Sequence, residues 1–151
     1  STIFKLLERF YECKVGKIEI NQVPINKYSA SDLRNNIVYM PKKPFFLQGT
    51  IMDNLKLGQN EISDLEVIEV CKKVGIHSDI QKLEKGYYEL IESGGENFSS
   101  GQKQKLGFVR VLLKKADIVL LDEVTSDLDG EAERQICNQI EEIAKKAIVL
   151  I

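Results

Sequence analysis

Two adjacent carboxylates, Asp122 and Glu123, are the residues of this chain best placed to do chemistry. They directly follow the apolar run 118–121, which is typical of a parallel strand buried on both faces. Ligands bind at the carboxyl edge of such sheets. An Asp at that edge can hold Mg²⁺, and a following Glu can orient an attacking water. A strand that ends in a solvated acidic turn would give the same pattern, so this segment alone leaves both interpretations open.

A polar segment before a predicted helix has the composition of a phosphate-binding helix start. A serine hydroxyl, free backbone N–H groups and the positive end of the helix dipole together suit a phosphate. An ordinary serine N-cap after a glycine-containing turn would have the same composition, so this segment is also ambiguous when taken alone. Its residues are Phe98, Ser99, Ser100, Gly101 and Gln102.

Hydrophobic periodicity predicts an α/β arrangement around these two segments. The expected strands cover residues 17–21, 37–40, 117–121 and 147–151. The expected helices cover residues 1–11, 31–35, 64–74, 101–115 and 132–146. Strand, helix and strand follow one another at the C-terminal end, which predicts a βαβ unit with parallel strands. The helical middle is then an insertion.

Three of these helices have a predicted apolar face. The helix over 64–74 is expected to begin with a capping box between Ser63 and Glu66 and to end at Gly75. Its predicted buried residues are Leu65, Ile68, Cys71 and Val74. The predicted buried residues of the two later helices are Leu106, Val109, Leu112 and Leu113, and then Ile136, Ile140 and Ile143.

Composition and charge exclude several classes of protein. The chain has 151 residues, 21 Lys and Arg against 23 Asp and Glu, and a net charge of -2, so nothing favours general binding to nucleic acid or anionic lipid. The longest apolar runs are too short to span a bilayer. The three cysteines are widely spaced and form no CxxC pair, which indicates reduced thiols. The single histidine, His77, lacks partners for a His-based metal site.

In this order and spacing, the segments resemble the nucleotide-binding domain of ATP-binding cassette (ABC) transporters of the exporter type. Residues 96–102 resemble the signature, usually LSGGQ, and residues 118–123 resemble the Walker B strand with its glutamate. The sequence Ser126-Asp127-Leu128-Asp129 resembles the D-loop. Residues 41–51 resemble the Q-loop segment, and Ser1-Thr2 resembles the end of a Walker A loop. The resemblance implies a partial P-loop NTPase (RecA-like) α/β core, from residues 1–41 and 116–151, with an inserted α-helical subdomain over about 42–115.

The resemblance also implies site roles. Ser1 and Asp122 would bind Mg²⁺, Thr2 would contact the phosphates of ATP, and Glu123 would be the general base for hydrolysis. The signature would cover ATP held by a second cassette, packed head to tail in a homo- or heterodimer. Asp129 would lie at that dimer interface. The signature residues concerned are Ser99, Ser100, Gly101 and Gln102.

The resemblance further implies a place of action. Phe45, Phe46 and Leu47 lie where the family's cassette receives the coupling helices of a transmembrane domain, although they also suit the core of the helical subdomain. The expected activity is ATP hydrolysis that drives export, at the cytoplasmic face of a membrane. A soluble ABC ATPase acting on DNA or RNA is a further alternative. The acidic balance and the Phe45-Phe46 pair argue against it.

The chain departs from the family pattern at four points. Two of them concern its ends, and two are replacements at expected nucleotide-contacting positions. Most of Walker A, including its lysine, precedes Ser1, and the switch histidine is expected after Ile151, so we expect a domain truncated at both ends. Lys42 stands at the Q-loop glutamine position beside the nucleotide, and Ser100 replaces a signature glycine. These two replacements favour the alternative of a degenerate, non-catalytic cassette that serves as a dimerisation or regulatory partner.

Overall fold

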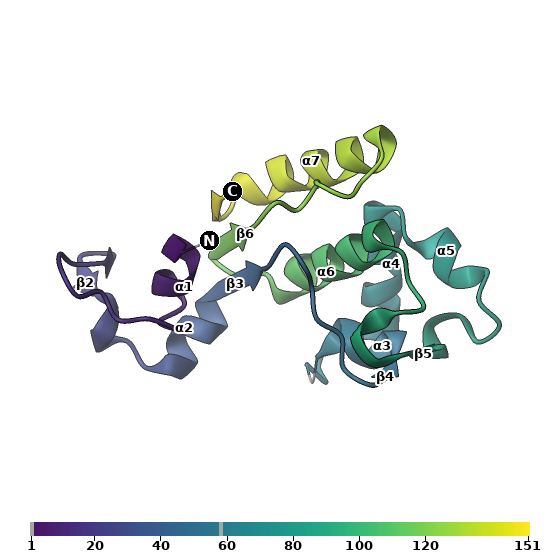
Figure 1. Ribbon diagram of the computed structural model, residues 1–151, viewed down its shortest axis with the longest axis horizontal. Helices are drawn as coiled ribbons and strands as arrows, with labels where there is room; N and C mark the ends of the chain where they lie inside the picture. The colour runs from purple at the N-terminus through teal and green to yellow at the C-terminus, as the bar shows by residue number, and fades with distance from the viewer. Residues whose placement is uncertain (1, 58) are drawn as a thin grey trace.

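A three-stranded parallel sheet lies near the middle of the molecule, as the computed structural model shows for residues 2–57 and 59–151 (Figure 1). Its strand order is β3-β6-β7. Two two-stranded antiparallel sheets, β1-β2 and β4-β5, accompany it. The strands are β1 (Glu19–Ile20), β2 (Val23–Pro24), β3 (Ile37–Met40), β4 (Gly49–Thr50), β5 (Leu90–Ile91), β6 (Ile118–Leu121) and β7 (Ile148–Leu150). The α-helices are α1 (Thr2–Leu7), α2 (Ala30–Asn36), α3 (Ile51–Lys56), α4 (Asp64–Val74), α5 (His77–Gln81), α6 (Ser100–Lys114) and α7 (Gly130–Ala144).

Strand β6 is the centre of the parallel sheet and is buried on both faces, as predicted. Val119, Leu120 and Leu121 are at most 2% exposed. Their register partners come from β3 on one side and β7 on the other, so Val119 lies between Val38 and Val149. Burial of such a continuous apolar run is the main reason that this segment forms an inner strand.

The unit β6-α7-β7 is the parallel βαβ unit that the sequence predicts. Helix α7 packs against α4 and β7 and leads the chain back to the sheet (Figure 1). Its Ile136 is fully buried. The expectation that the last strand is buried is wrong for its side chains, because Ile148 is 62% exposed and Leu150 is 39% exposed. Among the described residues, β7 pairs with β6 along one edge and has no neighbouring strand along the other.

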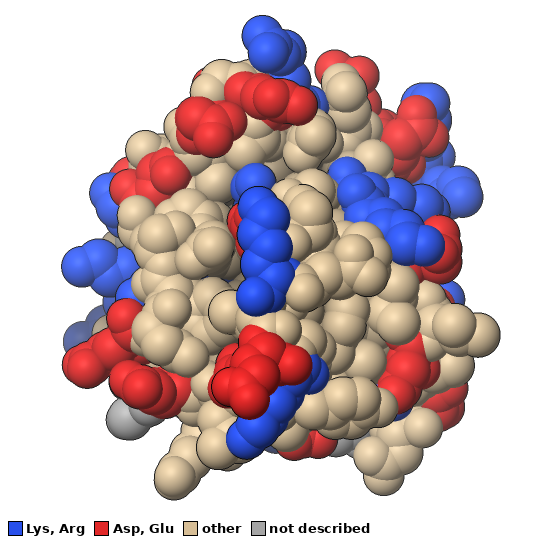
Figure 2. Space-filling model, turned by 90° about the vertical axis from the view of Figure 1, so that its right-hand side faces the viewer, with Lys and Arg blue, Asp and Glu red and all other residues tan. Residues whose placement is uncertain are grey.

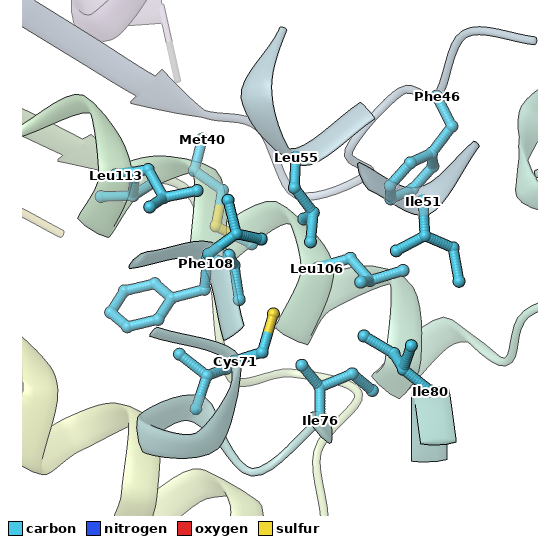
Figure 3. Packing of buried hydrophobic residues seen from close by; sticks show 14 of the residues in the cluster. Met40, Phe46, Ile51, Leu55, Cys71, Ile76, Ile80, Leu106, Phe108 and Leu113 are labelled. Atoms are coloured by element: carbon cyan, nitrogen blue, oxygen red, sulfur yellow. The ribbon is translucent and has the colours of Figure 1, made fainter. Parts of the chain in front are cut away.

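The helical middle and the sheet share one continuous hydrophobic core. Helix α6 packs against α4 and α3 on one side and against β3 on the other. Figure 3 shows Leu106 and Phe108 of α6 at the centre of this core, with Cys71 of α4 and Leu55 of α3 beside them; all four are at most 1% exposed. The helix that carries the signature-like segment is therefore held rigidly against the strands.

Several details of the predicted helices are wrong. The first helix ends at Leu7 rather than at residue 11, because Arg9 adopts a left-handed backbone with φ 56°. Leu65 is 74% exposed, because the buried face of α4 passes through Val67 instead. The predicted capping box is only half formed: the Glu66 amide donates to Ser63 Oγ at 3.2 Å, but the Glu66 carboxylate pairs with Lys115 Nζ at 2.6 Å.

Gly107 lets the segment after β3 pack closely on α6. A Cβ at this position would lie 2.6 Å from Pro44 Cγ and 3.2 Å from Met40 Cε. We expect Gly107→Ala to lower the free energy of unfolding by about 1–3 kcal/mol, because this overpacking outweighs the gain in helix propensity. Urea unfolding measures the change. Gly130→Ala is the control, because nothing lies within 4 Å of its Cβ position; equal stability of the two variants would contradict the prediction.

Candidate functional site

The carboxyl ends of β3 and β6 bring Lys42, Asp122 and Glu123 together. Met40 and Leu121 are register partners at the ends of these strands, and the Asp122 amide continues the ladder by donating to the Met40 carbonyl at 3.0 Å. The segments that follow each strand therefore leave the sheet side by side. This places a cation after one strand and two carboxylates after its neighbour.

Asp122 is held by a tyrosine from the neighbouring strand. Tyr39 Oη donates to Asp122 Oδ2 at 3.2 Å. Burial, and then the contact with Asp122, raise the pKa of Tyr39, so the hydroxyl stays protonated and keeps donating at neutral pH. The Tyr39 ring packs edge-on against Phe4 of α1, with centroids 5.9 Å apart. Thr2 begins the same helix and is exposed, whereas Ser1 lies outside the described residues.

Hydrogen bonds hold the backbone of Glu123, whereas its side chain forms a solvent-exposed ion pair. Its backbone is left-handed, with φ 50°. Its carbonyl accepts from the Ser126 amide at 3.3 Å and from Ser126 Oγ at 3.1 Å. Its carboxylate forms an ion pair with Lys42, and the two side chains are 58% and 49% exposed. Water screens a pair of this exposure, so a competing ligand can separate it.

Three nearby carboxylates affect the pKa of Lys42. Its hydrogen bond and charge interaction with Glu123 raise the pKa of the Lys42 ammonium, and Asp127 and Asp122 add to the same shift. The ammonium is therefore firmly charged at neutral pH. It has no lone pair to offer a metal ion, so Lys42 cannot act as the metal ligand that an amide oxygen at this position could be.

The signature-like segment forms the capped start of α6. The Gln102 amide donates to Ser99 Oγ at 3.2 Å, and the Ser99 amide donates to Gln102 Oε1 at 3.0 Å. These two bonds form a complete capping box. The sequence predicts only an ordinary serine N-cap as the alternative to a phosphate-binding segment. The polar groups of Ser99 and Gln102 are thus partly engaged within the helix. The first turn of α6 adjoins a hollow of about 400 Å³.

Asp129 lines the same hollow and also caps the next helix. Its Oδ1 accepts from the amides of Ala132 at 2.9 Å and Glu131 at 3.1 Å at the start of α7. The bond from the Ala132 amide is the first cause of a lowered pKa for Asp129, which therefore stays ionised at neutral pH. The hollow unites the signature-like segment with the D-loop-like turn. Its predicted site residues are Ser99, Ser100, Gly101, Gln102 and Asp129.

Gly101 is needed for close packing within the chain, which was not predicted from the sequence. A Cβ at this position would lie 3.0 Å from the Asp127 carbonyl oxygen, so the glycine allows α6 to approach the turn after β6 closely. Gln104 was missed as well. It is 2% exposed and bonds to that same turn. A polar residue in phase with the buried Phe108 and Val111 of α6 was the available signal.

Comparison with known proteins decides the family. The family model described as "ABC transporter" matches residues 1–126. The chain belongs to the ABC transporter family. Its fold is accordingly that of P-loop NTPases, and the resemblance seen in the motifs is confirmed.

Three proteins show what this ABC transporter chain is similar to. It is 39% identical over 137 residues to the leptomycin B resistance protein pmd1 of Schizosaccharomyces pombe, covering 90% of this chain and 10% of that protein. It is 37% identical to a probable ABC transporter ATP-binding/permease protein of Haemophilus influenzae, covering 100% of this chain and 28% of that protein. A solved structure of a bacterial Atm1-family ABC exporter with ATP bound superposes with a TM-score of 0.93 and 30% identity, covering 98% of this chain and 26% of that one. The chain thus spans a small part of each relative.

The donor chemistry at the end of β6 suits Mg²⁺. Within residues 2–57 and 59–151, no three His, Cys, Asp or Glu residues gather into a metal site of their own. Mg²⁺ usually takes one or two carboxylates and completes its shell with water and substrate phosphates. Asp122 fits that pattern, because Tyr39 engages only one of its two carboxylate oxygens.

The surface and the helices of this ABC transporter chain add two observations. Over the described part of the chain, no helix is both long and apolar enough to cross a bilayer. Figure 2 shows one face, on which Lys and Arg side chains are interspersed with Asp and Glu side chains among uncharged residues.

Proposed function

We propose that this chain belongs to the ATP-hydrolysing engine of an ABC exporter. The observation that carries the proposal is the meeting of Asp122 and Glu123 with the segment after β3 at the carboxyl edge of the sheet. Ser1 and Asp122 would hold Mg²⁺, and Thr2 would contact the phosphates. Mg²⁺, when bound, would neutralise charge on the phosphate oxygens. Relatives named as ATP-binding/permease protein and as an exporter with ATP bound support this assignment.

Glu123 would accept the proton of the attacking water. The water oxygen forms a bond to the γ-phosphorus, the bond from that phosphorus to the bridging oxygen breaks, and ADP and phosphate leave. Catalysis of this kind depends mainly on positioning and charge stabilisation. The fixed backbone of Glu123, with its carbonyl held by Ser126, suits a residue that must aim its carboxylate.

The predicted site residues form two separate groups, which supports a head-to-tail dimer. Lys42, Asp122 and Glu123 lie at the sheet edge, whereas the signature-like segment and Asp129 line a different hollow. In the proposed homo- or heterodimer, each composite site combines the sheet edge of one cassette with the hollow of the other. We also propose the division into an α/β portion, residues 1–41 and 116–151, and a helical subdomain over about 42–115.

The segment after β3 offers an apolar surface for a transmembrane domain. Phe45 is 61% exposed and Leu47 is 56% exposed, whereas Phe46 is 7% exposed and belongs to the core. The two interpretations of this aromatic pair are therefore compatible. We propose that Phe45 and Leu47 receive the coupling helices, which places the chain at the cytoplasmic face of a membrane.

ATP turnover by the natural polypeptide tests the proposed function. We expect phosphate release that requires Mg²⁺ and stops when EDTA removes it, together with dimerisation of the cassette on ATP binding. Phosphate release is measured with an enzyme-coupled assay, and dimerisation by light scattering. Absence of both ATP binding and turnover would overturn the proposal.

A second candidate function is the non-catalytic partner cassette, which the ion pair between Lys42 and Glu123 favours. The pair engages the carboxylate that would otherwise face the attacking water. ATP binding and dimerisation without turnover would support this candidate.

Lys42→Gln tests whether the ion pair restrains Glu123. If the ion pair only restrains Glu123, the variant should raise kcat by roughly two- to fivefold, the range expected for loss of an exposed pair. The control is Lys43→Gln, an exposed neighbour for which the structure gives no ion pair. Measurement at low and high salt adds a second readout, because salt weakens the pair and should narrow the difference. Equal kcat values for Lys42→Gln and the wild type would contradict this role of Lys42.

A further inference from the structure

Gln104 is a buried polar side chain that connects the signature-bearing helix to the turn after β6. It is 2% exposed, and burial of an amide is favourable only when its donors and acceptor are paired. Gln104 Nε2 donates to Ser126 Oγ at 3.2 Å and more weakly to the Glu123 carbonyl at 3.4 Å. Gln104 Oε1 accepts from the Asp127 amide at 3.2 Å. All three contacts are with residues 123–127.

The turn that Gln104 contacts needs such support. Glu123 has a left-handed φ of 50°, a conformation that is costly for a residue with a side chain and persists only where surrounding contacts fix it. Two donors from Ser126 reach the Glu123 carbonyl from within the turn. Gln104 adds a donor from outside the turn, on the rigid helix α6. It therefore ties the turn to α6.

The contact continues along α6 to its first turn. Gly101, three residues before Gln104, lies so close to the Asp127 carbonyl oxygen that a Cβ would be 3.0 Å from it. The start of α6 and the 123–127 turn are thus in contact at two successive points. A displacement of the start of α6 would be passed to the backbone of Glu123.

We propose that Gln104 is a positioning residue that aims the Glu123 carboxylate and couples it to the signature end of α6 in the same chain. The inference rests on the proposed function, in which the start of α6 contacts nucleotide held by a second cassette. Through Gln104, that contact is communicated to the catalytic glutamate of the chain's own site. Gln104 is buried and its amide hydrogen bonds go to the 123–127 turn, so we expect its effect on hydrolysis to pass through Glu123.

Steady-state ATP hydrolysis by the natural polypeptide tests this role. We expect Gln104→Leu and Gln104→Glu to lower kcat by roughly tenfold with little change in KM for ATP, because a misaimed base slows chemistry without removing binding contacts. Gln104→Glu keeps an acceptor for the Asp127 amide but loses the donor to the Glu123 carbonyl. Its kcat should therefore fall as far as that of Gln104→Leu.

Two comparisons separate positioning from loss of stability. Asn54→Ser is the matched control, because Asn54 is also 2% exposed and polar, but its partners Leu47, Thr50 and Arg110 all lie outside the 123–127 turn. It should lower stability without lowering kcat. In a double-mutant cycle, Gln104→Leu should have almost no further effect on the residual single-turnover rate of Glu123→Gln, because the carboxylate that it aims is already absent.

The outcomes distinguish this inference from the proposed function. Additive losses in the cycle, or a kcat for Gln104→Leu equal to that of Asn54→Ser, would overturn the role of Gln104 and leave the ATPase proposal intact. A wild type that does not hydrolyse ATP would overturn the role of Gln104 together with the ATPase proposal. A Glu123→Gln variant as active as the wild type would overturn the roles of Glu123 and Gln104 and leave ATP hydrolysis itself standing.

Discussion

Glu123→Gln is expected to lower kcat for ATP hydrolysis by about 10²- to 10⁴-fold, the contribution of a positioned general base, while ATP binding persists. The amide matches the carboxylate in shape but cannot accept a proton from water. The backbone contacts of Glu123 to Ser126 and Gln104 do not involve the substituted group, so the turn should keep its conformation. The loss should therefore be confined to chemistry.

Single-turnover hydrolysis and equilibrium ATP binding, measured side by side, check this prediction. Glu133→Gln is the matched control, because Glu133 lies exposed on α7 and outside the predicted site. It should hydrolyse ATP at the wild-type rate. We propose that the dimer formed on ATP binding reopens when ATP is hydrolysed, so Glu123→Gln should also accumulate the ATP-bound dimer. A rate within twofold of the wild type would show that Glu123 is not the base.

The sheet-edge part of the site could be predicted because its signal is local. The run 118–121 is apolar throughout, and the carboxylates of Asp122 and Glu123 follow it without a gap. Such a run is typical of an inner strand, and the position of Asp122 and Glu123 at its end then follows from connectivity. The same holds for the βαβ unit, since adjacent parallel strands need a long crossover connection, which is usually a helix.

The contacts between segments could not be predicted in this way. Lys42 and Glu123 are 81 residues apart in sequence, and their pairing depends on the register of β3 against β6. Gln104 was missed because its amide is satisfied by a turn that comes later in the chain. Leu65 was predicted to be buried because its spacing matches the apolar face of the helix. In the structure the helix is rotated so that Val67 is buried and Leu65 is exposed.

The second large effect is expected at Arg110, whose removal should lower the free energy of unfolding by about 3 kcal/mol. Arg110 Nε donates to the Asn54 carbonyl at 2.7 Å, Nη2 to Asn54 Oδ1 at 3.0 Å and Nη1 to the Phe45 carbonyl at 2.6 Å. Its guanidinium also lies over the Phe46 ring, 4.6 Å from the centroid. Burial lowers the pKa of Arg110 to about 10, so the group stays protonated and keeps all its donors at neutral pH.

Urea unfolding of Arg110→Ala and Arg110→Lys measures the loss and identifies its cause. Arg110→Ala removes one donor from the Asn54 carbonyl and one from Asn54 Oδ1, which keeps only the Leu47 amide, and it removes the cation from the Phe46 ring. Each of these losses penalises the folded state. Arg110→Lys keeps the charge, but its three N–H donors lie on one nitrogen and cannot span the three acceptors that Nε, Nη1 and Nη2 reach, so it should recover only a small part of the loss. Arg134→Ala, at an exposed position on α7, is the control and should leave stability nearly unchanged. Full recovery of stability by Arg110→Lys would contradict this explanation. It would mean that the positive charge stabilises this region, and not the several hydrogen bonds from α6 to α3 and to Phe45.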